Sequence, residues 1–145
     1  MAKLDPLIRV RKHTVEEKQK FLATLLAKEE ELLKKKADAL SKIETEASIA
    51  EEHPQDFGLQ KSFSQFKDSM TKQIARFDDE LEKLALRIEV AQESMREAFA
   101  DLKKVEIVDR SRKEAQAKEQ AKKENDVLDE IGLQMHRREQ DKKDK

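Results

Sequence analysis

The chain has 145 residues, of which 43% are charged and 4% aromatic, so little apolar material remains for a globular core. Lys and Arg total 31 against 32 Asp and Glu, and this balance argues against non-specific nucleic-acid binding, which depends on a net basic field. The absence of cysteine excludes disulfides and thiolate metal sites. No apolar run approaches the roughly 18 residues of a membrane span, so we expect one soluble, cytoplasmic domain without a secretory signal.

A first helix is expected over about residues 5–52. Asp5 and Pro6 are typical of a helix start, because Asp accepts hydrogen bonds from unpaired backbone N–H groups and Pro fits the first helical position. Apolar residues then recur every seven residues, with a second series three residues later: Ile8, Val15, Leu22, Ile43 and Ala50, then Leu25, Leu32 and Ala39. Glu29 and Lys36 occupy two positions of the first series. We favour the interpretation that their aliphatic stems lie along the seam while their charged groups reach water, over a role in fixing the register of the helix pair.

The helical pattern breaks at residues 53–58, where we expect a turn. Pro54 disfavours helix in the residue before it, and Gly58 offers the backbone freedom of a tight reversal. The second helix is therefore expected to begin at about Leu59. Because the connection is short, it predicts antiparallel neighbours.

The second helix, expected over about 59–138, carries the strongest coiled-coil pattern in the chain. Two interleaved seven-residue series run through it without Gly or Pro: Phe63, Met70, Phe77, Leu84, Ala91, Ala98 and Val105, then Ile74, Leu81, Ile88, Met95 and Leu102. This spacing is typical of a coiled-coil seam, which requires a partner helix. Folded about the turn, the two seams match in length and place Leu22 opposite Ala91 and Leu25 opposite Ile88. An all-α antiparallel two-helix hairpin is thus favoured over two separate dimers.

Beyond Val105 the seam stops, while residues that favour helix continue. Roughly 20 residues, or about 30 Å of helix, should therefore extend past the first helix as an overhang. A second apolar cluster lies on one face of this segment: Val127, Leu128, Ile131 and Met135. We expect nothing in the chain to bury this cluster, and we expect the polar tail, 139–145, to fray.

No catalytic constellation is recognisable. The three histidines, His13, His53 and His136, lack the spacing of metal ligands, and two glycines cannot build a phosphate-binding loop. We therefore expect no enzyme activity, no catalytic residues, no cofactor and no metal. Function should lie in surfaces that other proteins contact.

Both ends of the chain resemble the flagellar export protein FliJ family. The opening Leu-Asp-Pro-Leu-Ile-Arg-Val-Arg-Lys-His (4–13) and the later Lys-Glu-Asn-Asp-Val-Leu-Asp-Glu-Ile (123–131) carry the likeness. The resemblance implies a stalk-like antiparallel coiled coil that docks with the hexameric flagellar export ATPase, contacts the membrane export-gate protein and handles export chaperones. It also implies a role in motility, at the base of the flagellum on the inner face of the cell membrane. The contact residues it implies are Arg9, Arg11, Lys12, His13, Asp129, Glu130, Ile131 and Met135.

Two alternatives stay open at this point. One is the equivalent stalk of a virulence injectisome, which the sequence barely separates from the flagellar protein. The other is a coiled-coil holdase chaperone or scaffold, which would hold its clients with apolar residues at the turn. The turn offers only Phe57 and Leu59, whereas the overhang offers four apolar residues, which favours the stalk.

Overall fold

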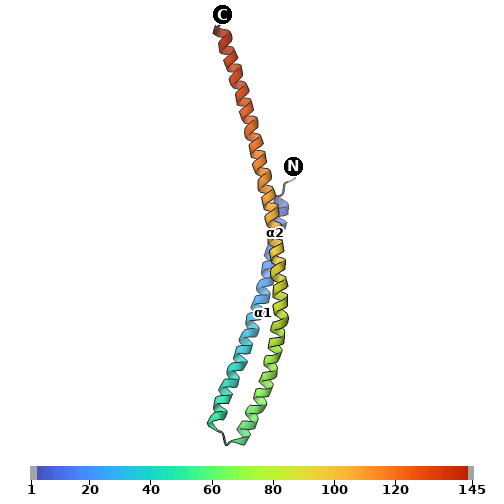
Figure 1. Ribbon diagram of the computed structural model, residues 1–145, viewed down its shortest axis with the longest axis vertical. Coiled ribbons are helices and arrows are strands. Elements are labelled where there is room, and N and C mark those ends of the chain that lie inside the picture. Colours follow the sequence, from blue (N-terminus) through green and yellow to red (C-terminus); the bar gives the residue numbers. More distant parts are fainter. Residues whose placement is uncertain (1–2, 144–145) are drawn as a thin grey trace. The chain divides into compact units, whose positions relative to one another are not determined.

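The computed structural model describes residues 3–143, which form two helices, α1 (Asp5–Glu52) and α2 (Phe57–Lys143), with no strand in that range (Figure 1). Two compact units can be distinguished. The hairpin unit comprises Arg11–Phe99, and the terminal unit comprises the described parts of Met1–Val10 and Ala100–Lys145. The single domain expected from the sequence stays a prediction. Neither helix contains, within residues 3–143, a stretch long and apolar enough to span a bilayer.

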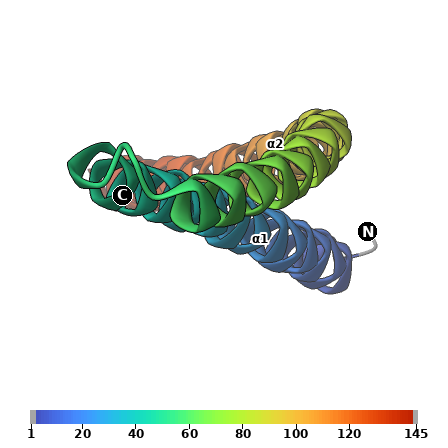
Figure 2. The ribbon, with the colours of Figure 1, turned by 90° about the horizontal axis from the view of Figure 1, so that it is seen from below.

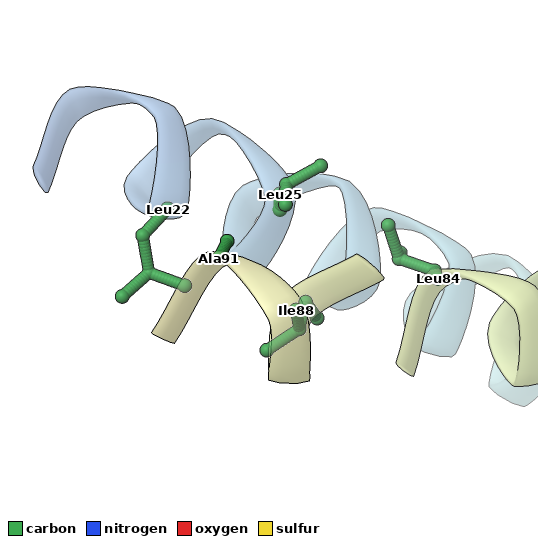
Figure 3. Packing of buried hydrophobic residues seen from close by; sticks show 5 residues of the cluster. All are labelled: Leu22, Leu25, Leu84, Ile88 and Ala91. Atoms are coloured by element: carbon green, nitrogen blue, oxygen red, sulfur yellow. The ribbon is translucent and has the colours of Figure 1, made fainter. Parts of the chain in front are cut away.

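In the hairpin unit, α1 and α2 run antiparallel and side by side, joined by the short turn (Figures 1 and 2). This confirms the predicted helical hairpin. A buried cluster of five residues joins the two helices (Figure 3): Leu22, Leu25, Leu84, Ile88 and Ala91. Leu32 and Met95 pack against this cluster. All of these residues belong to the predicted seam series. Both predicted pairs, Leu22 with Ala91 and Leu25 with Ile88, have their two members in this cluster.

Charged residues in the seam are accommodated at its edge. Among the described residues that are classed as buried, none is polar or charged. Glu29 and Lys36 are half-buried, and Lys36 Nζ lies 2.6 Å from Asp78 Oδ1 on α2. The Lys36 head thus reaches a carboxylate on the other helix as well as the solvent. Because both partners remain substantially exposed, this ion pair contributes at most about 1 kcal/mol, and the apolar seam dominates stability.

The turn occupies residues 53–56 and is therefore shorter than the predicted range of 53–58. The backbone N–H of Asp56 donates to the carbonyl of His53 at 3.2 Å, and Pro54 takes the second position of this β-turn, where its fixed φ fits. Asp56 also caps α2, since its Oδ1 accepts a hydrogen bond from the Leu59 N–H at 3.0 Å. This cap starts α2 at Phe57, two residues before the predicted start.

The role predicted for Gly58 is wrong. Gly58 lies in the first turn of α2, and no residue from 3 to 143 has a positive φ, so the reversal uses no left-handed backbone. At the other end, α2 continues to Lys143 and includes residues 139–143 of the tail that was expected to fray. Residues 144–145 of that tail lie outside the described residues.

One side chain of α2 joins the two helix ends at the turn. Gln60 Nε2 donates to the carbonyl oxygen of Ala50 at 2.7 Å and to that of His53 at 3.1 Å. Ala50 lies in the last turn of α1 and His53 directly follows that helix, and each carbonyl also accepts a backbone N–H, from His53 and Asp56 respectively. Gln60 therefore closes the C-terminus of α1 from the neighbouring helix.

In the terminal unit, the first turns of α1 pack beside α2. The N–H of Ile8 donates to the Leu4 carbonyl at 2.9 Å, so Leu4 occupies the cap position and Asp5, expected there, lies in the first turn. Ile8 and Val105 are half-buried, whereas every residue from Arg110 to Lys143 is exposed. This exposed part of α2 confirms the overhanging C-terminal helix.

Candidate functional site

The overhang carries an uncovered apolar face. Its four residues, Val127, Leu128, Ile131 and Met135, have exposed fractions between 46% and 63%. Spacings of three and four residues place them on one side of α2, and we call them the C-terminal apolar face. Glu130 of the predicted contact set is exposed and borders this face, whereas Asp129, two residues before Ile131, is exposed on the opposite side of the helix. An apolar helical face of this kind, with a carboxylate beside it, is typical of a helix that binds in a groove of another protein.

One apolar residue of the overhang was not singled out from the sequence. Leu133 is 58% exposed, and it follows Ile131 by two residues, which places it on the opposite side of the helix. It breaks the periodic pattern, so a search for one apolar face passes over it. The adjoining Gly132 does not interrupt α2, and nothing lies within 4 Å of the place where its Cβ would stand.

One exposed ion pair connects the N-terminal segment to α2. Lys113 Nζ lies 3.0 Å from Asp109 Oδ2 and 3.9 Å from Asp5 Oδ1. The hydrogen bond and the negative charge of Asp109, with the more distant charge of Asp5, raise the pKa of Lys113 above its ordinary value. The pair between Lys113 and Asp5 adds little to stability, and it shows that the start of α1 lies beside the point of α2 where the overhang begins.

The structure does not join Arg9 and the C-terminal contact residues into one site. Within the terminal unit, Asp5 contacts Lys113, which precedes Asp129 by 16 residues, or about 24 Å of helix at about 1.5 Å per residue. Because α1 runs antiparallel to α2, Arg9 lies on the far side of Asp5 from the overhang. These residues therefore offer two separate surfaces.

Of the other predicted contacts, Lys12 and His13 are exposed on α1. His13 Nε2 lies 2.9 Å from Glu17 Oε1, one helical turn further along the same helix. Such an exposed pair contributes little and leaves the imidazole open to a partner. Lys12 and His13 are thus accessible on α1, and their role as contact residues stays a prediction.

Arg11 differs from its neighbours because it is half-buried, and its Nε is enclosed without a hydrogen-bond partner. It follows Ile8 by three residues and precedes Val15 by four, which is the spacing of the seam. The periodicity of α1 therefore predicts that the aliphatic part of the Arg11 side chain packs in the seam, whether or not Arg11 also contacts another protein. We therefore regard it as the weakest of the predicted contact residues.

Residues 3–143 contain no group of three or more His, Asp or Glu arranged to hold a metal ion. What the described surface offers is protein contact through exposed apolar and charged side chains of two helices.

A family model described as Flagellar FliJ protein matches residues 1–141, which include all of α1 and nearly all of α2. No curated protein and no solved structure matches the chain. The matched region contains both terminal motifs and the C-terminal apolar face. The chain therefore belongs to the flagellar FliJ protein family, whose members are structural components of the flagellar export apparatus.

Proposed function

We propose that this chain is a stalk that docks, through its overhang, with the hexameric flagellar export ATPase and links it to the export-gate protein and to export chaperones. The observation that carries the proposal is the C-terminal apolar face on a stretch of α2 that no other described residue covers. Exposed apolar side chains at helical spacing are typical of a helix that binds in a groove. Membership of the flagellar FliJ protein family supports the export apparatus as the assembly in which this contact would be made.

Two contact surfaces support a linking role. Ile131 and Met135 would enter an apolar groove, while Glu130 at the edge would favour a basic residue beside it, and Asp129 would act from the opposite side of the helix. Lys12, with Arg9 and His13 nearby in the sequence, would make a second contact that is predominantly basic. A protein with two such surfaces can hold two partners at once, at the inner face of the cell membrane where the flagellum is based.

The alternatives are less well supported. The family match names the flagellar protein, which favours the flagellar over the injectisome system. A holdase that grips at its tip needs apolar side chains there, yet Phe57, 86% exposed, is the one large apolar residue prominent at the turn. Leu59 is half-buried.

The test replaces Ile131 with Asp in the full chain, with Phe57→Asp as the matched control at the turn. Both sites are exposed, so circular dichroism should show hairpins as stable as the native one. Ile131→Asp should weaken binding to the purified export ATPase by tenfold or more, since placing an unpaired carboxylate in an apolar interface costs about 1–3 kcal/mol. It should also reduce motility in the source cell, whereas Phe57→Asp should do neither.

The reverse result would refute the stalk. If Ile131→Asp cells swim normally and Phe57→Asp abolishes motility, the turn is the working end and a chaperone that grips with its tip is favoured. If neither variant changes ATPase binding, the overhang is not the docking surface.

A further inference from the structure

The hairpin unit has an apolar groove, and none of the predicted contact residues lines it. Phe21 of α1 faces Leu86 and Val90 of α2 across a hollow of about 410 Å³, which Lys18, Arg87, Ala91 and Ser94 also line. This volume falls in the range of roughly 300–1,000 Å³ that is typical of binding pockets. We call these seven residues the hairpin groove.

The large apolar residues of the groove, unlike the buried Ala91, lie outside the seam that stabilises the hairpin. Leu86 and Val90 fall outside both seam series, and they are 63% and 70% exposed. They stand one helical turn apart, so they present a continuous apolar strip on the outside of α2. Most positions on the outer faces of a coiled coil are polar, because nothing covers them. An apolar strip of this kind indicates a contact with another chain.

The charges of the groove select its occupant. Its two charged lining residues, Lys18 and Arg87, are both cationic, and they come from opposite helices. A segment that fits should therefore present apolar side chains at helical spacing with carboxylates at their edges. The occupant should itself be helical, because neighbouring pockets along a two-helix groove match residues three or four apart.

The chain itself contains a segment with this chemistry. The C-terminal apolar face offers aliphatic side chains, of which Ile131 is central, and the carboxylate of Glu130 lies at its border. The groove and this face are thus complementary in both hydrophobicity and charge. We propose that the hairpin groove binds the C-terminal apolar face of a second copy of this chain.

This association would use the same face as the proposed export contact. A copy whose overhang is bound to another copy could not at the same time present Ile131 to the export ATPase. Self-association and export docking would then compete, and the assembled form would be a reserve from which free stalks dissociate. The self-association itself does not depend on the proposed function, because both surfaces belong to this chain.

The test is sedimentation equilibrium of the full chain from about 10 µM to about 1 mM, the range in which interfaces below standard size assemble. The weight-average mass should rise above the 16.9 kDa of the monomer with concentration. Val90→Glu and Ile131→Asp should each weaken the association by about tenfold or more, because each places a carboxylate in the apolar contact. In dilute solution, where the chain is monomeric and no competition arises, Val90→Glu should leave ATPase binding unchanged, which separates this inference from the proposed function.

A charge exchange tests the pairing itself. Arg87→Glu alone should weaken self-association, and Arg87→Glu combined with Glu130→Arg should restore it, since the attraction is recovered with opposite signs. A constant monomer mass would overturn the proposal. So would an association that Val90→Glu leaves intact, or one that Val90→Glu abolishes and Ile131→Asp does not. The last result would mean that another segment, or another protein, occupies the groove.

Discussion

Leu25→Ala should be the most informative test of the seam. Leu25 is 2% exposed and belongs to the cluster that joins α1 to α2. The substitution removes the equivalent of three methylene groups, worth about 0.8 kcal/mol each when buried, or about 2.4 kcal/mol together. The space left behind adds to this loss, but a two-helix seam is open at its sides and can partly close. We expect a total loss of about 3 kcal/mol, near the low end of the range for buried Leu→Ala changes.

The measurement is urea unfolding followed by circular dichroism, with Leu128→Ala as the matched control. Leu128 is 63% exposed on the overhang, so the same chemical change there should alter the free energy of unfolding by less than about 0.5 kcal/mol. Equal losses at the two positions would mean that the overhang is packed in solution. A loss below about 1 kcal/mol at Leu25 would mean that the seam is not the main source of stability.

Two further predictions concern the register and the turn. Cysteines introduced at Leu22 and Ala91 should form an intramolecular disulfide under mild oxidation, because both residues lie in one buried cluster. Gel electrophoresis would detect the disulfide, and a result that shows only intermolecular cross-links would exclude this pairing of the two helices. Gln60→Ala should lower the free energy of unfolding by about 1 kcal/mol in urea, because the Ala50 and His53 carbonyls lose a donor. An unchanged free energy of unfolding would show that water replaces the Gln60 side chain at these carbonyls without a loss of stability.

The positions of the surface contacts were only partly predictable from sequence. Arg11 was grouped with its exposed neighbours because the resemblance to a family treats the N-terminal motif as a unit. Its half-burial follows from its place in the seam, which is a property of periodicity and not of the motif. The hairpin groove could not be predicted from the sequence for a different reason. Phe21 and Val90 are far apart in the chain, and each alone is an unremarkable exposed apolar residue.

The amino-acid sequence by itself determined the fold class, the long helices, the antiparallel pairing and the overhang. Heptad spacing is a local property, and two seams of equal length joined by a short turn leave few other arrangements. Tertiary structure decided where the turn closes and which side chains become neighbours across it. Two hydrogen bonds identify Asp56 as the cap, in place of Gly58 as the pivot: its backbone N–H donates to the His53 carbonyl, and its side-chain carboxylate accepts from the Leu59 N–H. The groove likewise exists only where α1 and α2 lie together, because its lining combines residues that no local pattern connects.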